Sequence, residues 1–412
     1  MKVLVINSGS SSIKYRLYDE SNPTPLVRGA VSRIGQTGST LDYTSYAEHQ
    51  CLSVAAPTHE AGLRLLVDSL LDERLGVVRD VREIGAVGHR AVHGGSAFRG
   101  SVLIDDAVIR KMEECVPLAP LHNPPNLVGI RAARKILPHA EQVAVFDTAF
   151  HSTMPAKAFL YALPYEYYER YGIRRYGFHG TSYRYVLARS CEILRCKPSD
   201  VRMIVAHLGN GSSMVAIDQG RSIDTSMGLT PLEGLMMGSR SGDIDPGVIF
   251  HLRRELGMGV DQIDELLNTK SGLLGVSGVS NDVRDLVEGV AAGNERCAIA
   301  LDMFAYRAKK YIGAYAAALG GLDVMVFTGG IGENSALVRE MICADLGFLG
   351  LELDEDRNTS TVGAEGTISA DSSRVRILVV PTDEEWMIMQ DTLAIVRSAA
   401  HEPKGYAHAR IA

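Results

Sequence analysis

One short pattern occurs twice in this chain, once in each half. "VLVINSGSSSIKYRLYD" at residues 3–19 predicts a strand, a Gly-Ser-Ser tripeptide and a second strand. "VAHLGNGSSMVAIDQG" at residues 205–220 repeats this order, and Gly211 follows Gly9 by 202 residues. Because GSS alone is a common tripeptide, the inference depends on the flanking strands. We interpret the two hairpins as the mark of a duplicated domain.

The first hairpin admits two interpretations. Asn, Ser and Gly are turn formers for backbone reasons, so residues 7–12 fit a solvated turn. Alternatively, backbone N–H groups, hydroxyls and Lys14 form a cradle for phosphate. It is not a Walker A loop, because the GxxxxGK[ST] spacing is absent and a strand follows. The repeat favours a phosphate loop in each half, with a nucleotide in the cleft between the two domains.

The composition restricts the class of protein. A length of 412 residues predicts two or three domains, and 46% hydrophobic with 22% charged residues is typical of a soluble globular protein. The net charge of −7 gives no reason to expect nucleic acid or an anionic membrane as a partner. No apolar run approaches the ~18 residues of a membrane-spanning helix.

The cysteines and the first residues indicate the cellular compartment of the protein. The six cysteines show no CxxC spacing and are expected to be reduced thiols. The first residues already predict a strand, without the basic start and cleavage site of a signal peptide. We therefore expect a cytoplasmic protein.

Strands and helices alternate along the chain, which predicts an α/β fold. An amphipathic helix is predicted over residues 296–319, ending at Gly320-Gly321. The predicted strands are "VLVI", "AVGHRAV", "VAVFDTAF", "MIVAHLG", "VMVFTGG" and "VRILVVPT".

Two arginines are expected in glycine-containing loops. Arg90 follows the strand predicted around residues 84–87, in "GHRAVHGG" with His89 and His93, and Arg240 lies in "SRSGDIDP". Taken singly, each is more often a surface or ion-pair residue. In a chain with two hydroxyl-rich loops they favour a phosphoryl clamp, because the planar guanidinium matches phosphate oxygens and stabilises transition-state charge.

Carboxylates follow two further predicted strands. Asp147 comes after "VAVF", and Asp383, Glu384 and Glu385 come after "VVPT". Ligands and Mg²⁺ gather at the carboxyl ends of strands in α/β proteins, so these acids are candidate ligands. The simpler alternative is that Asp383 begins the next helix and Glu385 lies in its first turn.

Two motifs predict helix starts. His179 precedes Thr-Ser in "RYGFHGTSYRYV", where a histidine commonly only packs or forms a hydrogen bond. "VFTGGIGENSALV" predicts a strand, a glycine-rich turn and a helix beginning near Asn334, where N–H groups suit an anion or a nucleotide edge. Zinc spacing and a nucleophile elbow are absent.

A series of motifs, taken in order, resembles the acetokinase family, the acetate kinases. The motifs run from residue 3 to about residue 390. They are "INSGSSSIK", "GHRAVHGG", "LAPLHNPPNL", "VFDTAFH", "YGFHGTS", "HLGNGSS", "GLMMGSRSGDIDP", "FTGGIGENS" and "PTDEE".

The resemblance implies the duplicated acetate and sugar kinase/actin-type α/β fold, with two domains around a nucleotide cleft, and a homodimer. It implies an N-terminal domain at residues 1–148, joined by a C-terminal helix at 386–412. The C-terminal domain at 149–385 then holds the second phosphate loop, the adenosine site and the dimer interface.

The resemblance also implies the reaction, a reversible phosphoryl transfer from ATP to acetate that gives ADP and acetyl phosphate. The implied metal ion is Mg²⁺, with Mn²⁺ as the alternative. The residues that match the family's catalytic groups are Arg90, His122, Asp147, His179 and Arg240. Asn7 and Glu384 match groups that position the metal ion.

The family's binding residues map onto two further sets. The matches to the nucleotide site are Ser10, Ser12, Lys14, His207, Gly209, Asn210, Gly211, Asp282, Val283, Arg284, Gly330, Ile331 and Asn334. The matches to the acetate site are Arg90 and the apolar residues Val92, Leu121, Phe178 and Pro231, which surround the methyl group.

The implied chemistry agrees with the residue types. A carboxylate needs no deprotonation at pH 7, so the site must position groups and neutralise charge rather than supply a general base. A propionate or butyrate kinase of the same family is the alternative, although Val92 and Phe178 favour the smaller acid. An ATP-driven filament or chaperone of the same fold would leave Arg90 and Arg240 without a role.

Overall fold

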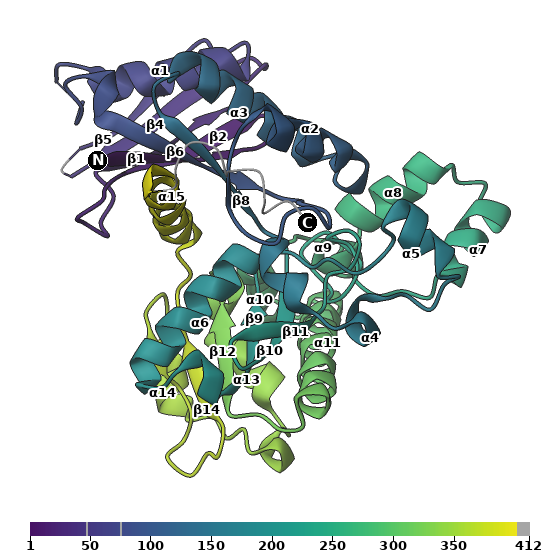
Figure 1. Cartoon of the computed structure of the whole chain (residues 1–412). Helices are drawn as coiled ribbons and strands as arrows, with labels where there is room; N and C mark the ends of the chain where they lie inside the picture. Colours follow the sequence, from purple (N-terminus) through teal and green to yellow (C-terminus); the bar gives the residue numbers. More distant parts are fainter. Residues whose placement is uncertain (47, 75, 402–412) are drawn as a thin grey trace. The chain divides into compact units, whose positions relative to one another are not determined.

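Figure 1 shows the computed structural model of the chain, which describes residues 1–46, 48–74 and 76–401. The chain forms two compact units, each with its own sheet. Unit 1 comprises Met1–Phe150 and the chain from Asp383 onward, and unit 2 comprises His151–Thr382. Of the helix expected at 386–412, α15 (Glu384–His401) includes the first part, and the rest lies outside the described residues.

Unit 1 has an eight-stranded sheet in the order β5-β4-β3-β2-β1-β6-β8-β7. The strands from β5 to β1 pair antiparallel, β1–β6 and β6–β8 pair parallel, and β7 is antiparallel to β8. The strands are β1 (Lys2–Ser8), β2 (Ser12–Asp19), β3 (Val27–Ser32), β4 (Thr40–Ser45), β5 (His49–Ser53), β6 (Ile84–Ala91), β7 (Val102–Leu103) and β8 (Glu141–Phe146).

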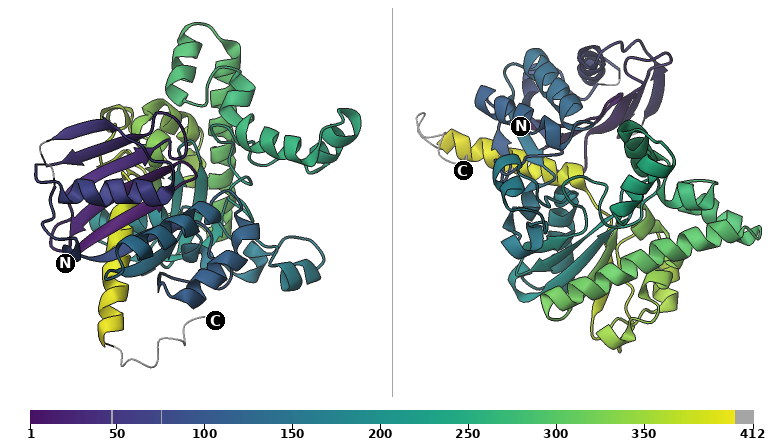
Figure 2. Two further views of the ribbon diagram at one scale, coloured as in Figure 1. Left: turned by 90° about the horizontal axis from the view of Figure 1, so that it is seen from above. Right: turned by 90° about the vertical axis from the view of Figure 1, so that its right-hand side faces the viewer.

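Both faces of this sheet are covered, which explains the apolar run in β1. Leu4 and Ile6 face a core shared with α1 (His59–Leu71) and α3 (Asn123–Ile136). Val3 and Val5 face the other side, where α15, yellow in Figures 1 and 2, packs through Ile388 and Met389. A further helix of unit 1 is α2 (Asp106–Glu114).

Unit 2 has a six-stranded sheet in the order β11-β10-β9-β12-β14-β13. β9–β10, β10–β11 and β13–β14 pair antiparallel, whereas β9–β12 and β12–β14 pair parallel. The strands are β9 (Arg202–His207), β10 (Ser213–Asp218), β11 (Arg221–Thr225), β12 (Val324–Thr328), β13 (Gly366–Thr367) and β14 (Arg376–Val379).

The predicted duplication is confirmed by the topology. The order β3-β2-β1-β6-β8 in unit 1 matches β11-β10-β9-β12-β14 in unit 2. Two antiparallel pairings followed by two parallel pairings occur in both. Each Gly-Ser-Ser hairpin joins the first two strands of its copy, although the second loop, residues 208–212, is longer than the first, residues 9–11.

The helix predicted at 296–319 is also confirmed, as α11 (Glu295–Leu319), which ends on Gly320 in the left-handed conformation at φ 67°. Figure 1 shows α6 on one side of the sheet of unit 2 and α11 on the other. The other α-helices of unit 2 are α4 (Ala156–Phe159), α5 (Glu166–Tyr171), α6 (Gly180–Leu194), α7 (Gly247–Glu255), α8 (Val260–Thr269), α9 (Gly272–Ser277), α10 (Val283–Ala291), α12 (Gly329–Asn334), α13 (Ala336–Cys343) and α14 (Glu355–Ser360). Short 3₁₀ helices lie at Val81–Glu83, Val116–Leu118, Ala149–Thr153, Pro198–Asp200 and Gly347–Leu349.

All six cysteines lie within the described ranges and are free thiols. None of the helices in residues 1–46, 48–74 and 76–401 combines the length and apolarity that a membrane crossing requires.

Candidate active site

The carboxyl ends of β1, β6 and β8 meet at one edge of the sheet in unit 1, because these strands are parallel neighbours. Ile6 pairs with His89, so Asn7 lies at the same edge as Arg90. The backbone N–H of Asp147 donates a hydrogen bond of 3.0 Å to the carbonyl of Ala91 at the end of β6. Three candidate residues therefore share one edge.

The strand predicted from "AVGHRAV" is confirmed as β6, but the placement of Arg90 in a loop after residues 84–87 was wrong. Arg90 lies within β6, not in a loop after it, because pairing with β8 extends the strand to Ala91. His89 is correspondingly buried, and its Nε2 lies 2.7 Å from Oε1 of Gln142. Burial lowers the pKa of His89 to about 4, so the ring is neutral at pH 7 and belongs to the core.

Arg90 is held by the buried carboxylate of Asp147. Nη2 of Arg90 lies 2.6 Å from Oδ2 of Asp147, and Nε lies 3.2 Å from both carboxylate oxygens. Oε2 of Glu384 is 3.7 Å from the same Nε. Burial raises the pKa of Glu384 to about 7, although the charge of Arg90 opposes this shift. The arginine thus has two carboxylates around it.

The other two acids of "DEE" have a different partner. Nη1 of Arg16 lies 2.8 Å from Oδ1 of Asp383, and Nη2 lies 3.2 Å from Oε2 of Glu385. Oδ1 of Asp383 also accepts the backbone N–H of Trp386 at 3.0 Å, so Asp383 caps α15, as the simpler alternative predicted. Of the three acids, Glu384 is the one directed to Arg90.

Asn7 and Glu384 are the residues expected to position Mg²⁺. Among the residues that the structure describes, no group of three or more His, Cys, Asp or Glu side chains is arranged to hold a metal ion. Asn7 and Glu384 offer only one amide oxygen and one carboxylate. Such a small set of donors suits a Mg²⁺ ion held mainly by substrate phosphates and water, because this ion needs only one or two protein carboxylates. The amide oxygen of Asn7 and the carboxylate of Glu384 therefore fit this ion.

The first hairpin has the open form of a binding loop. The N–H of Gly9 donates to the carbonyl of Ser12 at 2.8 Å, and Nε2 of His59 lies 2.7 Å from the carbonyl of Gly9. Ser10 and Lys14 are exposed and Ser12 is half-buried. The hydroxyls and the ammonium are thus accessible to a ligand.

Two asparagines of α3, which we did not predict, hold the backbone around this edge. Asn126 accepts the N–H of Val92 at 3.1 Å and donates to the carbonyl of Ser8 at 2.9 Å. Asn123 accepts the N–H of His93 at 3.1 Å and donates to its carbonyl at 3.0 Å. Both are buried. The only signal in "HNPPN" is their spacing of three, which places them on one helix face.

In unit 2, the second hairpin lies close to Arg240 and His179. A Cβ atom on Gly211 would lie 3.5 Å from Nη1 of Arg240 and 3.8 Å from Cε1 of His179. Nδ1 of His179 lies 2.8 Å from the hydroxyl of Ser213, and its ring stacks on His207 with centroids 4.2 Å apart. Four predicted residues of unit 2 therefore lie together.

His179 occupies the N-cap of α6, so the predicted helix start is confirmed. Its φ of 60° is in the left-handed region, which a residue with a Cβ adopts at some cost. Such strain is frequent at functional sites. Ser182 in the first turn of α6 connects Nδ1 of His207, at 2.9 Å, with the hydroxyl of Thr382, at 2.8 Å.

Arg240 has an unusual environment for an arginine. Its Nη1 lies 3.4 Å from the carbonyl of Pro231 and 4.0 Å from the sulfur of Met237. Burial lowers the pKa of Arg240, and no carboxylate in residues 1–46, 48–74 and 76–401 forms an ion pair with it. A half-buried guanidinium of this kind is a ready site for an anion.

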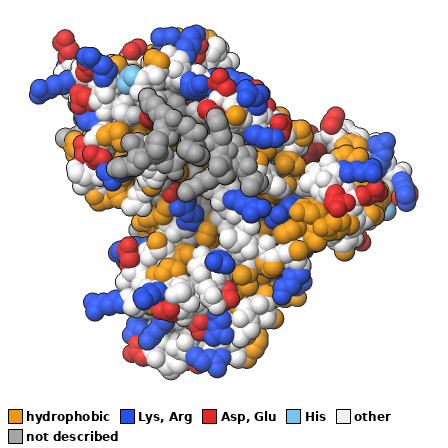
Figure 3. Space-filling view, in the orientation of Figure 1, with side chains coloured by type: hydrophobic (Ala, Val, Ile, Leu, Met, Phe, Trp, Pro, Cys, Tyr) orange, Lys and Arg blue, Asp and Glu red, His pale blue; other side chains and the backbone are white. Residues whose placement is uncertain are grey.

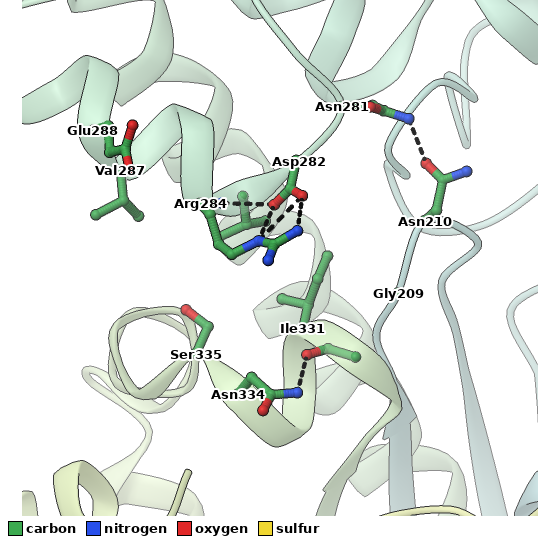
Figure 4. A pocket seen from close by; sticks show the side chains of 12 residues that line it. Gly209, Asn210, Asn281, Asp282, Arg284, Val287, Glu288, Ile331, Asn334 and Ser335 are labelled. Carbon is green, nitrogen blue, oxygen red and sulfur yellow. Dashed lines mark hydrogen bonds and ion pairs between the residues drawn. The ribbon is translucent and has the colours of Figure 1, made fainter. Parts of the chain in front are cut away.

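A pocket of about 730 Å³ lies between the second hairpin, α10 and α12, within the usual size of ligand sites (Figure 4). Nη2 of Arg284 lies 2.6 Å from Oδ2 of Asp282, and Asn281 donates to Oδ1 of Asn210 at 3.0 Å. Asn334 donates to the carbonyl of Gly330 at 2.9 Å. The lining residues are Gly209, Asn210, Asn281, Asp282, Val283, Arg284, Val287, Glu288, Gly330, Ile331, Asn334 and Ser335.

The helix predicted to begin near Asn334 is confirmed as α13, but the glycine-rich turn predicted before it was wrong. The glycine-rich segment is itself a short helix, α12, and α13 begins at Ala336. Oε1 of Glu333 accepts the N–H of Gly329 at 2.7 Å, and the carbonyl of Leu208 accepts that of Ile331 at 2.8 Å. The N–H groups of Gly329 and Ile331 are therefore used within the fold and are not available to an anion.

The remaining predicted residues are distributed over both units. In unit 1, Val92 is buried, Leu121 is 68% exposed and His122 is the N-cap of α3. In unit 2, Phe178 is buried and Pro231 is half-buried.

A five-stranded core that occurs twice in one chain is the topology of the acetate and sugar kinase/actin class of folds. Comparisons with known proteins give the family within this class. The model of the acetokinase family matches residues 2–390. The chain therefore belongs to the acetokinase family, and it is an enzyme of that family.

Individual relatives agree with this assignment. The acetate kinase of Halothermothrix orenii is 54% identical over 97% of this chain and 100% of its own length. The crystal structure of Porphyromonas gingivalis acetate kinase is 51% identical, with a TM-score of 0.93 over 96% of this chain and 99% of that one. A propionate kinase from Francisella tularensis is 40% identical, with a TM-score of 0.90 over 96% and 99%.

Proposed function

We propose that this enzyme catalyses the reversible transfer of the γ-phosphoryl group of ATP to acetate, forming acetyl phosphate and ADP. The observation that supports this most directly is Arg240, half-buried beside Gly211 and without a carboxylate partner in the described part of the chain. An uncompensated guanidinium next to a glycine-rich hairpin suits the oxygens of a transferring phosphoryl group.

The proposed step is a direct, in-line displacement. A carboxylate oxygen of acetate attacks the γ-phosphorus while the bond from this phosphorus to the β,γ-bridging oxygen breaks, and that oxygen leaves with ADP. No proton moves, because acetate is ionised at pH 7 and ADP leaves as an anion. The side chains therefore hold the reactants in line and neutralise charge.

The proposed catalytic roles follow from the contacts within each unit. Arg90, oriented by Asp147, and Arg240, oriented by its loop, bind the phosphoryl group and the acetate carboxylate. His122 and His179 donate hydrogen bonds to phosphoryl oxygens. Asn7 and Glu384 hold Mg²⁺, or Mn²⁺ in its place, and the bound ion supplies further neutralisation of phosphate charge.

We assign the pocket beside the second hairpin to the adenosine part of ATP. It is large enough for a nucleoside, and Gly209, Asn210, Gly330 and Ile331 line it where the hairpin meets α12. His207 and Gly211 belong to the same hairpin segment. Ser10, Ser12 and Lys14 in unit 1 are assigned to the phosphates, because their polar groups are accessible.

Acetate is the proposed acceptor, and propionate or butyrate is the alternative. Val92, Leu121, Phe178 and Pro231 are proposed to surround the methyl group, and two of them are bulky and buried. Propionate stays an alternative because the chain is also similar to a solved propionate kinase. One methylene group changes affinity by only about 1–3 kcal/mol.

The test is the dependence of ADP formation on acetate. We expect ADP to form at a substantial rate only when acetate and Mg²⁺ are both present. ADP release at the same rate without a carboxylic acid would contradict the proposal and would favour an ATPase that switches conformation.

We also propose a cytoplasmic homodimer. The six cysteines are free thiols, which fits a reducing compartment. Hydrophobic side chains gather on the part of unit 2 that contains α5, α7 and α8 (Figure 3), including Tyr171, Val248 and Phe250, which are exposed. Light scattering should give a mass near 90 kDa, twice the 44.6 kDa of one chain.

A further inference from the structure

The direction of the Arg240 side chain depends on the loop that contains it. Both of its polar contacts, the carbonyl of Pro231 and the sulfur of Met237, belong to that same loop. No acid in the described residues orients the guanidinium, in contrast to Arg90 and Asp147. Whatever fixes the shape of this loop therefore fixes the direction of Arg240.

Two hydrogen bonds between Asp243 and Gly234 join the two ends of the loop. Oδ1 of Asp243 accepts the backbone N–H of Gly234 at 2.8 Å, and its own N–H donates to the carbonyl of Gly234 at 2.9 Å. Gly242 precedes it at φ +66°, and a Cβ atom there would lie 2.3 Å from the carbonyl oxygen of Leu235. The closure thus requires glycine at 242 and a short acceptor at 243.

The closed loop is attached to α11 through Asp243. Oδ2 of Asp243 accepts a hydrogen bond of 2.6 Å from the hydroxyl of Tyr311, and Nη1 of Arg307 donates to the backbone carbonyl of Asp243 at 3.0 Å. Arg307 and Tyr311 are one helical turn apart on α11, so both present the same face of this helix. Burial and the nearby carboxylate raise the pKa of Tyr311, so the phenol keeps its proton and donates it.

The other end of the loop has an independent anchor. Nη2 of Arg175 lies 2.5 Å from Oε1 of Glu233, and the hydroxyl of Tyr161 donates to Oε2 of Glu233. Glu233 immediately precedes Gly234. Ser239 and Ser241, on either side of Arg240, are also hydrogen-bonded to α8 and to Ser271 after it, so loss of the contact at Asp243 would shift the segment containing Arg240 without detaching the loop.

We propose that Asp243 and Tyr311 are positioning residues for Arg240. Through the hydrogen bond between them, the rigid helix α11 sets the direction in which Arg240 presents its guanidinium. This inference rests on the proposed function, because it assumes that Arg240 binds the transferring phosphoryl group.

The first test compares Tyr311→Phe with Tyr315→Phe. Each removes one tyrosine hydroxyl from α11 and keeps the ring, but Tyr311 is half-buried and bonded to Asp243, whereas the buried hydroxyl of Tyr315 has no hydrogen-bond partner within the described residues. We expect Tyr311→Phe to lower kcat about tenfold while KM for ATP stays constant, because misplacing a catalytic group by a fraction of an ångström reduces turnover. Tyr315→Phe should keep kcat within about twofold. Equal values of kcat for the two variants would overturn the proposal.

The second test is a double-mutant cycle with Arg240→Ala. If Tyr311 acts through Arg240, Tyr311→Phe should change kcat by less than about twofold in the Arg240→Ala background. A tenfold loss in both backgrounds would show a merely structural role and overturn the proposal. Asp243→Asn keeps an acceptor for Gly234 and should retain more activity than Asp243→Ala, which provides a second variant if Tyr311→Phe is unstable.

The outcomes separate this proposal from the proposed function. Wild-type turnover of Arg240→Ala would refute the role of Arg240 itself, whatever Tyr311→Phe does. An impaired Arg240→Ala together with a fully active, folded Tyr311→Phe would refute only the positioning pair.

Discussion

Arg90 and Asp147 form an ion pair at the carboxyl edge of the first sheet, with Nη2 2.6 Å from Oδ2. Asp147 is only 1% exposed, so its carboxylate is a fixed acceptor rather than a mobile surface group. Arg240 in unit 2 is oriented by its loop and has no such acid in the described residues. The two candidate phosphoryl-binding arginines are thus held in different ways.

Both arginines are expected to be indispensable for turnover. Arg90→Ala and Arg240→Ala should each lower kcat by about 10³, as the loss of an arginine that stabilises a transferring phosphoryl group does. Arg64→Ala, which removes a surface ion pair on α1, should keep wild-type kcat. A folded Arg90→Ala or Arg240→Ala variant with nearly normal kcat would remove that residue from the mechanism.

The adjacent acids Glu384 and Glu385 should differ in their effect on the metal requirement. Glu385 pairs with Arg16, whereas Glu384 lies beside Arg90. Glu384→Ala should raise the Mg²⁺ concentration for half-maximal activity, and Glu385→Ala should change it little. The measurement is a Mg²⁺ titration of both variants at saturating ATP and acetate. The reverse order would mean that the metal-positioning glutamate is Glu385.

Val92 tests the pocket for the acetate methyl group. Val92→Ala makes room for one more carbon without removing a charged group, and burying one CH₂ contributes about 0.8 kcal/mol. The ratio of kcat/KM for propionate to that for acetate should therefore rise by roughly fourfold, because discrimination by one methylene group rarely exceeds about 1–3 kcal/mol. Most of the change should appear in KM for the acid, with KM for ATP constant. An unchanged ratio with both rates lowered would show that Val92 is only a core residue.

His151 should contribute to the pH dependence of stability. It is buried, with Nε2 2.9 Å from the carbonyl of Phe178 and Nδ1 2.8 Å from the hydroxyl of Ser222. Burial lowers the pKa of His151 from 6.5 to about 4. Below pH 6.5 His151 therefore binds a proton in the unfolded chain but not in the folded chain. The stability that the neutral ring contributes is complete above pH 6.5 and is lost as the pH falls toward 4.

The measurement compares Tm at pH 7 and pH 5. Between pH 7 and pH 5 the free energy of unfolding of His151→Gln should fall by about 2 kcal/mol less than that of the unsubstituted protein, so its Tm should also fall less. His49→Gln, at an exposed position, serves as the control and should follow the unsubstituted protein. If His151→Gln and the unsubstituted protein fall in parallel, His151 is not the group that resists protonation.

The duplicated fold could be predicted because its signals are local. Each Gly-Ser-Ser turn lies between two apolar strands, and the end of α11 is marked by Gly320. By contrast, the extension of β6 to Arg90 depends on its pairing with β8, more than 50 residues away along the chain. The residues around Arg90 fitted both a strand, "AVGHRAV", and a glycine-containing loop, and the pairing with β8 decides between the two.

The errors and omissions at the candidate site also come from distant contacts. Glu333 and the carbonyl of Leu208 occupy N–H groups of α12, which the pattern of strand, glycines and helix does not reveal. No role was predicted for Asn123 or Asn126, because nothing in the sequence around them names the backbone groups that they contact. Asn123 accepts the N–H of His93, just after β6, and Asn126 donates to the carbonyl of Ser8 at the end of β1.

Trapping the product as a hydroxamate shows whether the enzyme phosphorylates acetate. Purified protein with ATP and Mg²⁺ would be supplied with acetate, propionate or butyrate in separate reactions containing hydroxylamine. We expect acetohydroxamate to form fastest, with a lower kcat/KM for propionate and a still lower one for butyrate. A higher kcat/KM for propionate or butyrate, or no hydroxamate from any of the three acids, would contradict the assignment.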